Sequence, residues 1–154
     1  MIHVPFENKW MRLAYLIAKD FYKIKKWNKK TTPVAILVSE QGEYISHGLC
    51  ADGLHAVEGH CDRLETKGSP YSACKWCHHS EHAERKALEQ AFKLGIEPHN
   101  ASIYIYGHYK VCDSCMYELQ KYGINTIYIL ENAEELFDRH NPNTVLDTLN
   151  QFAI

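Results

Sequence analysis

Apolar residues recur every three or four positions between about Glu7 and Trp27, and this period predicts an amphipathic helix with one buried face. The apolar positions of that face are Trp10, Leu13, Ala14, Ile17, Phe21 and Ile24. A cluster of lysines lies at and beyond the end of the helix, at Lys23, Lys25, Lys26, Lys29 and Lys30. Such a cluster either binds phosphate or a polynucleotide, or is a solvated helix end that complements the helix dipole. We favour the solvated end.

A near-continuous apolar run, Pro33–Val38, predicts a strand that is buried on both faces. The Gln41–Gly42 pair then turns the chain, and Tyr44–Gly48 returns as a partner strand, so a hairpin is expected here. Two further strands are predicted at Ala101–Gly107 and Ile124–Leu130. Because a helical segment separates these two, we expect them to pair in parallel.

Three helical patterns occur in the second half of the chain, at about 80–95, 112–123 and 133–152, the last broken near Asn141–Pro142. Ser80 is the expected N-cap of the first helix, and Gly95 its expected end. The positions expected to face the core from the first two helices are Ala83, Ala87, Leu88, Ala91, Leu94, Met116, Leu119 and Tyr122. With the strands, these helices predict one three-layer α/β/α domain over residues 1–154, with a mixed central sheet and helices on both faces.

Length and composition agree with a single soluble domain. The chain has 154 residues, of which 45% are hydrophobic and 23% charged. Its net charge of −2 gives no bulk attraction to nucleic acid or to an anionic membrane. No apolar run approaches the roughly 18 residues of a membrane helix, and residues 1–5 have no signal-peptide character. We expect a cytoplasmic protein with no membrane partner.

Two short motifs combine metal ligands with a carboxylate. His82 and Glu84 open a predicted helix, where the helix end itself faces a site and lets both side chains converge. Cys112 and Cys115 begin the next helix on one face, where the helix dipole favours their thiolates. One histidine and two thiolates are three zinc ligands, which leave the fourth tetrahedral position open for water. In a reducing compartment, Cys-x-x-Cys pairs accompanied by histidines indicate metal more often than disulfides.

This order of His-x-Glu followed by Cys-x-x-Cys resembles the zinc-dependent cytidine/deoxycytidylate deaminase superfamily, and most of all its dCMP deaminase branch. The resemblance implies that His82, Cys112 and Cys115 hold a catalytic zinc. It implies that Glu84 is the catalytic residue, which moves protons between water, the pyrimidine ring and the departing amine. It also implies that the Ala83 carbonyl and main-chain amides near Cys112 contact the base.

The stretch from about 49 to 79 shows no sustained period, and so long an irregular segment within a compact domain needs something to hold it. The metal-knuckle spacing of Cys74 and Cys77 predicts a second, structural zinc whose binding energy folds this insertion. Some members of the dCMP deaminase branch carry such a zinc. The expected ligands are Cys61, Cys74, Cys77 and His60, with His78, His79 or Cys50 as alternative fourth ligands. The other interpretation is scattered reduced cysteines, with His79 only capping the next helix.

Three departures from the family pattern bear on the substrate. Val111 replaces the proline that usually precedes the first cysteine, and the segment before it is longer than usual. Cys50 stands where dCMP deaminases tend to have an asparagine that helps hold the sugar or base, and a thiol cannot donate and accept as an amide does. The candidate substrate-binding residues are Ala83, Cys50, His108, Tyr109 and Lys110, and Lys110 is a candidate partner for a phosphate.

Together these observations favour an enzyme that deaminates a free pyrimidine nucleotide or nucleoside, converting dCMP to dUMP with release of ammonia. One catalytic and one structural Zn2+ are expected, in a homo-oligomer. The lysine cluster and Tyr104, Tyr106 and Tyr109 allow action on a base within RNA or single-stranded DNA, although strand aromatics are more often core. A zinc-stabilised binding protein without catalysis is the other alternative, and the retention of Glu84 argues against it.

Overall fold

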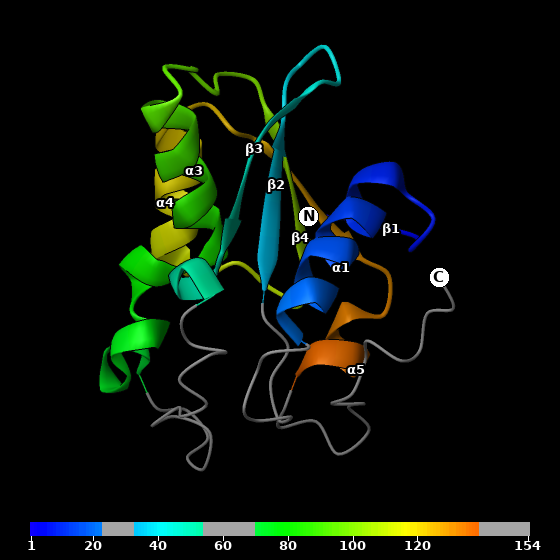
Figure 1. The fold of residues 1–154 in the computed structure, drawn as a ribbon, viewed down its shortest axis with the longest axis vertical. Coiled ribbons are helices and arrows are strands. Elements are labelled where there is room, and N and C mark those ends of the chain that lie inside the picture. Colours follow the sequence, from blue (N-terminus) through cyan, green and yellow to red (C-terminus); the bar gives the residue numbers. More distant parts are fainter. Residues whose placement is uncertain (23–32, 54–69, 139–154) are drawn as a thin grey trace.

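The computed structural model describes residues 1–22, 33–53 and 70–138 (Figure 1). Its strands form one five-stranded mixed sheet in the order β1-β5-β4-β2-β3. The strands are β1 (Ile2–Val4), β2 (Val34–Val38), β3 (Tyr44–Leu49), β4 (Ser102–Tyr106) and β5 (Thr126–Leu130). The parallel pairing of β4 with β5 and the antiparallel hairpin of β2 with β3 confirm the sequence predictions, and β2 also runs antiparallel to β4.

β1 is a strand that the sequence pattern did not reveal. It pairs in parallel with β5, and Val4 lies opposite Leu130. Val4 is buried, whereas Ile2 and His3 are exposed. A strand of three residues with this burial pattern has neither an apolar run nor an alternation of apolar and polar residues by which the sequence could reveal it. The strand forms because β5 offers it an edge, which is a property of the folded sheet.

Helices cover both faces of the sheet (Figure 1). They are α1 (Lys9–Tyr22), α3 (Ala83–Lys93), α4 (Asp113–Lys121) and α5 (Ala133–Phe137). Successive residues of β2 point to opposite faces, so Val34 and Ile36 pack with α1 and α5, and Ala35 and Leu37 pack with α3 and α4. All of β2 is buried, as expected for a strand that is covered on both sides. The predicted three-layer α/β/α architecture is confirmed.

The buried face of α1 is rotated from the predicted one. Asn8 starts the helix, because its side-chain oxygen accepts the N–H groups of Trp10 and Met11 at 3.0 and 3.1 Å. Leu13 and Trp10 are only partly buried, and the buried positions are Met11, Ala14, Tyr15 and Ala18. The predicted end near Trp27 and the lysine cluster lie outside the described residues.

α3 begins later than predicted. Its N-cap is His82, and Ser80 lies instead in the short 3-10 helix η4 (His79–Glu81). The backbone of His82 is extended, with φ −66° and ψ 149°, so helical geometry starts only at Ala83. The prediction of Ser80 as N-cap was therefore wrong, and the histidine itself occupies the turn into the helix.

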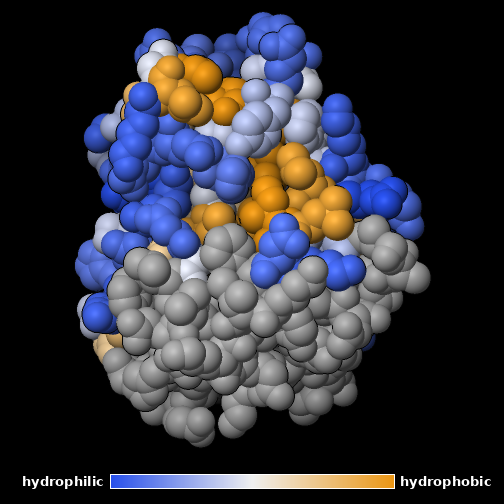
Figure 2. All heavy atoms as spheres, viewed as in Figure 1, coloured by the Kyte–Doolittle hydropathy of each residue, from blue (hydrophilic) through white to orange (hydrophobic). Residues whose placement is uncertain are grey.

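The carboxyl end of α3 also differs from the prediction. Leu94 was expected to be buried but is 59% exposed, because α3 ends at Lys93 and the left-handed Gly95 (φ +71°) then turns the chain. Phe92 and Ile96 are exposed beside it, and Figure 2 shows an apolar area over this end of α3.

The later helices follow the expected pattern in part. In α4, Leu119 is fully buried, while Met116 and Tyr122 are partly buried against the same core. α5 ends at Phe137, and Asp138 is extended. The rest of the helix predicted to reach residue 152 lies outside the described residues. Among the described helices, none combines the length and the apolar character needed to cross a membrane.

Short 3-10 helices occupy the described part of the insertion between β3 and α3. They are η1 (Cys50–Gly53), η2 (Tyr71–Ala73), η3 (Lys75–Cys77) and η4 (His79–Glu81). The last three follow one another directly into α3. The insertion therefore leads the chain to His82 through a series of tight turns, and residues 54–69, which include His60 and Cys61, lie outside the described residues.

Candidate metal and active site

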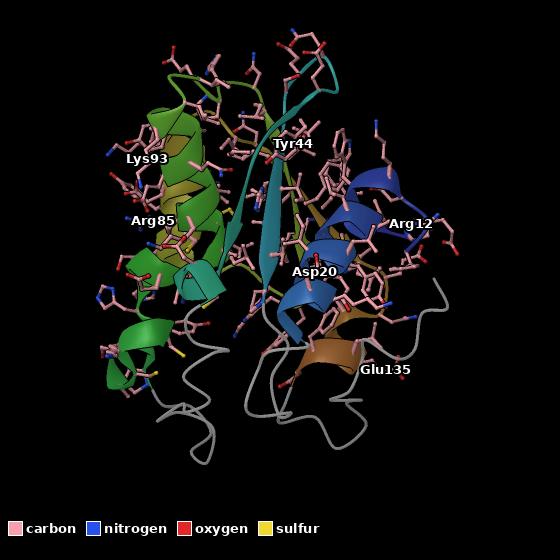
Figure 3. All side chains as sticks on the ribbon, in the orientation of Figure 1. Arg12, Asp20, Tyr44, Arg85, Lys93 and Glu135 are labelled. Carbon is pink, nitrogen blue, oxygen red and sulfur yellow. The ribbon has the colours of Figure 1, made fainter. Side chains whose placement is uncertain are left out.

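The amino ends of α3 and α4 bring His82, Cys112 and Cys115 together. Nδ1 of His82 lies 3.4 Å from Sγ of Cys112 and 3.4 Å from Sγ of Cys115. Cys112 is the N-cap of α4, and its sulfur accepts the backbone N–H of Cys115 at 3.4 Å. In Figure 3 the sulfur atoms gather around the amino end of α3 and the short helices before it.

These distances match the requirements of zinc. With Zn–S bonds of about 2.3 Å and Zn–N bonds of about 2.0 Å, a sulfur and a nitrogen ligand of a tetrahedral ion lie about 3.5 Å apart. The two sulfur-to-nitrogen separations at His82 are both 3.4 Å. The donor set also suits zinc, because thiolate and imidazole are its preferred ligands in proteins. His82, Cys112 and Cys115 therefore fit a zinc ion with little rearrangement.

The insertion orients His82. Nε2 of His82 lies 2.9 Å from the carbonyl oxygen of Cys77. A carbonyl oxygen can only accept, so Nε2 is the donor in this bond and Nδ1 is the ring atom that faces the thiols. Holding the remote ring nitrogen in this way is how metal-binding histidines are commonly oriented. The backbone carbonyl of Cys77 thus belongs to the site, whereas its thiol is an expected ligand of the second zinc.

The pKa values of the two thiols are shifted in opposite directions. Hydrogen bonding with the Cys115 thiol, followed by that with His82, lowers the pKa of Cys112 to about 3, against the effect of burial. The same bond with Cys112, followed by burial, raises the pKa of Cys115. Burial lowers the pKa of His82, but its hydrogen bond to Cys112 and the charge of Glu84 outweigh this and raise it. Cys112 therefore favours the thiolate form, which is the form that binds a metal, and the ring of His82 beside it supports that form.

Glu84 is a buried carboxyl group in the first turn of α3. Only 6% of the residue is exposed, and burial is the main cause that raises the pKa of its carboxyl group. One of its oxygens, a ring nitrogen of His82 and Sγ of Cys115 all lie within 4.8 Å of one another. A carboxyl group with a raised pKa beside a metal site is suited to accept and then return a proton.

The structure adds His79 and Tyr71 to this neighbourhood. Nδ1 of His79 lies 3.4 Å from Sγ of Cys112, although the sequence offered His79 only as a possible ligand of the second zinc. The Tyr71 ring makes edge contacts with the rings of His79 and His82, at centroid distances of 5.1 and 4.5 Å. The three-residue spacing of His79 and His82 could have indicated that His79 lies near the site, whereas nothing in the sequence pointed to Tyr71.

The predicted second zinc site is described only in part. Cys74 and Cys77 are 2% and 1% exposed and form a small buried cluster with Tyr71. Both groups of three ligand atoms found among the described residues contain His82, and neither includes Cys74 or Cys77. The other expected ligands, Cys61 and His60, lie outside the described residues. Of the alternative ligands, His78 is exposed and Cys50 is buried in η1.

The candidate substrate contacts lie on three segments, namely η1 with Cys50, the start of α3 with Ala83, and the segment before α4. Ala83 is buried at the start of α3, directly against β3, since a Cβ added to Gly48 would collide with the Ala83 carbonyl oxygen. In the segment before α4, the rings of His108 and Tyr109 stack at 5.3 Å, and Nζ of Lys110 lies 5.5 Å from the Tyr109 ring centroid. Lys110 is exposed, so its ammonium group is accessible to a ligand.

Lys86 joins three segments around the start of α3. Its ammonium group lies 3.3 Å from carboxylate oxygens of Asp52 and Glu81 and 3.4 Å from one of Glu89, and its side chain is only 13% exposed. Asp52 and the neighbouring Ala51 have left-handed backbones, with φ of +52° and +53°, a conformation that costs energy in residues other than glycine. The ion pair with Lys86 holds this turn of η1 against α3. The sequence analysis did not identify Lys86.

Comparison with known families identifies the family to which the chain belongs. Residues 5–131 match the family described as "Cytidine and deoxycytidylate deaminase zinc-binding region". The chain therefore belongs to the cytidine and deoxycytidylate deaminase family, as the motifs predicted. The metal site and the buried glutamate described above lie within the matched residues. No curated protein matches the chain.

Solved structures similar to the chain include two kinds of deaminase. The diaminohydroxyphosphoribosylaminopyrimidine deaminase/5-amino-6-(5-phosphoribosylamino)uracil reductase of Thermotoga maritima is 22% identical with a TM-score of 0.46, over 77% of this chain and 27% of that protein. The chain thus spans about a quarter of that relative. The dCMP deaminase of cyanophage S-TIM5, in complex with dCMP and dUMP, is 16% identical with a TM-score of 0.48, over 83% of this chain and 88% of that one.

Proposed function

We propose that the chain is a zinc-dependent hydrolase that deaminates a free pyrimidine nucleotide, with dCMP as the first candidate. His82, Cys112 and Cys115 would hold the zinc, and Glu84 would be the catalytic residue. The observation that carries the proposal is the position of the buried Glu84 carboxylate within 4.8 Å of ligand atoms of His82 and Cys115. A purely structural zinc site has no need for a buried carboxyl group beside it.

The proposed reaction replaces the 4-amino group of a cytosine ring with oxygen from water. The C4–N bond breaks, a C4–O bond forms, and ammonia leaves. When bound, zinc supplies Lewis-acid activation that lowers the pKa of a water to about 7. Glu84 accepts the proton that the water loses and donates it to ring N3, and it then carries the proton of the new C4 hydroxyl group to the departing amine. Its burial supports this role, because burial raises the pKa of the carboxyl group and so makes it a better proton acceptor than an exposed carboxylate.

The chain's own residues also supply orientation. The Cys77 carbonyl holds the ring of His82, and the close packing of β3 on α3 at Gly48 fixes the position of the Ala83 carbonyl, a candidate contact for the base. Lys110 is proposed to pair with the phosphate of a nucleotide, which favours a nucleotide over a nucleoside. Cys50, His108 and Tyr109 complete the proposed substrate contacts.

A second, structural zinc at Cys74 and Cys77 belongs to the same proposal. Both thiols are buried, as ligands of a structural metal are, and the segment that carries them is made of short turns with little apolar core of its own. Cys61 and His60 would complete the site. The alternative of polynucleotide deamination has less support, because Tyr106, one of the aromatic residues that favoured it, is fully buried in the core.

The deciding experiment measures ammonia release and substrate mass change over free cytosine and adenine nucleosides, nucleotides and short oligonucleotides. We expect turnover of a free pyrimidine nucleotide, its loss on removal of metal by a chelator, and its return with added zinc. Turnover restricted to oligonucleotides would favour the polynucleotide alternative. Zinc binding without turnover of any substrate would favour a binding protein.

A further inference from the structure

His79 sits beside one of the two candidate thiolate ligands because of the local turn. It opens η4, and the backbone N–H of His82 donates to the carbonyl oxygen of His79 at 3.2 Å. In a 3-10 turn, side chains three residues apart lie on the same side. The rings of His79 and His82 accordingly lie 5.5 Å apart, on the side from which α4 presents Cys112.

Cys112 receives a contact that Cys115 does not share among the described residues. Its sulfur lies 3.4 Å from each of three nitrogens, namely Nδ1 of His79, Nδ1 of His82 and the backbone nitrogen of Cys115. His79 groups with His82 and Cys112, whereas the group around Cys115 contains His82 and Glu84. His79 therefore lies on the Cys112 side of the site, and the group around Cys115 does not include it.

Tyr71 holds the His79 ring in this place. The edge contacts of Tyr71 with both imidazoles fix their spacing, and His79 is only half-buried. The neighbouring His78 is a natural comparison. It is exposed, and its Nδ1 accepts the Ser80 backbone N–H at 3.2 Å within its own turn. Among the contacts of the described residues, His78 has no bond to a candidate ligand.

We propose that His79 is a positioning residue for the metal site, donating its Nδ1–H to the sulfur of Cys112. The inference rests on the proposed function, because it requires that Cys112 hold the metal. With His82 engaged through Nδ1 as a ligand, the donors left on the Cys112 sulfur are His79 and the Cys115 backbone N–H. Two such donors orient the thiolate and draw charge from its sulfur.

The test compares His79→Ala, His79→Asn and the control His3→Ala, at an exposed histidine of β1, with the wild-type protein. The asparagine amide can place an N–H where Nδ1 lies, whereas alanine leaves no donor. Zinc affinity is measured by competition with a chromophoric chelator, and the cobalt-substituted proteins are compared by the energy of the sulfur-to-cobalt charge-transfer band. We expect His79→Ala to weaken zinc binding about 10- to 100-fold and to move the band, with recovery in His79→Asn and no change in His3→Ala.

Each of the other outcomes overturns either the role of His79 or the proposed function. Equal affinity and an unchanged band in His79→Ala, with the wild type binding zinc, overturn the role of His79 and leave the proposed function intact. A change in the intensity of the cobalt d–d bands that shows loss of a ligand also overturns it, because His79 would then bind the metal directly. A wild-type chain that binds neither zinc nor cobalt at this site overturns the proposed function itself. Circular dichroism of each variant verifies that it is folded.

Discussion

Nε2 of His82 and the carbonyl oxygen of Cys77 are joined by a hydrogen bond of 2.9 Å. This bond links the candidate catalytic metal site to the segment that carries the second pair of cysteines. Any change that moves the backbone of Cys77 also moves the ring of His82, so the candidate metal site is not structurally independent of this segment. The link gives the insertion a role in the site in addition to its own stability.

Glu84→Gln is expected to abolish most turnover while retaining zinc. The amide keeps the shape of the side chain but cannot take up and return a proton. General acid–base catalysis typically contributes about 10²- to 10⁴-fold, and Glu84 serves more than one transfer, so kcat should fall by at least that factor. Steady-state kinetics with metal analysis measure both effects, and Glu89→Gln on the exposed side of the same helix is the control. Retention of most activity would contradict the catalytic role.

The same variant has a predicted pH signature in metal-free protein. Burial raises the pKa of Glu84 above its ordinary value of 4.5. The stability that this carboxyl group contributes is therefore full below 4.5 and is lost as the pH rises through the higher folded-state pKa. Glu84→Gln should unfold at a higher temperature than the wild type at mildly alkaline pH, and the difference should close toward pH 4.5. A difference that is constant with pH would show that Glu84 is not buried as a charged group.

Metal analysis is expected to find two zinc ions per chain, and Cys74→Ser or Cys77→Ser should remove one of them. Each variant should lower the unfolding temperature, because the energy of metal binding folds the insertion. Cys112→Ser should mainly abolish activity. The link from Cys77 to His82 predicts weaker binding of the remaining zinc as well. One zinc per chain in the wild type, unchanged in Cys74→Ser, would reject the second site.

Lys110→Ala is expected to raise KM for a nucleotide and to leave any nucleoside activity unchanged. Lys110 is exposed, so the binding free energy lost with this contact should be at the low end of the range for charge-assisted hydrogen bonds. We expect a loss of about 1.5 kcal/mol, which corresponds to a roughly 10-fold higher KM. Lys121→Ala is a matched control, because that ammonium group likewise lies over a tyrosine ring, 5.4 Å from the centroid of Tyr122. Equal losses on nucleotide and nucleoside would mean that Lys110 only shapes the site.

Lys86→Met is expected to destabilise the protein by about 1–2 kcal/mol, because three carboxylates lose a shared cation. Lys93→Met is the control. Its ammonium group lies 3.0 Å from Glu89, but 74% of its side chain is exposed, so its loss should cost less than about 0.5 kcal/mol. Urea unfolding measures both values. Equal effects of the two variants would show that the Lys86 cluster does not hold η1 against α3.

The sequence by itself determined the core of this protein and the chemistry of its site. The apolar run of β2, the hairpin with β3 and the parallel pairing of β4 with β5 follow from local patterns and chain connectivity. The residue types at His82, Cys112 and Cys115 predict a zinc site, and their order and spacing indicate the family. These features could be read because each depends on neighbouring residues or on a known order of motifs.

Only the tertiary structure decided which groups support that site. β1 exists because β5 offers an edge, and the rotation of α1 reflects the packing of Tyr15 against Tyr106. His79 meets Cys112, and the Cys77 carbonyl meets His82, because a series of tight turns brings the insertion against two helix ends. Contacts of this kind depend on how the backbone folds in three dimensions, and a local sequence pattern does not predict that arrangement.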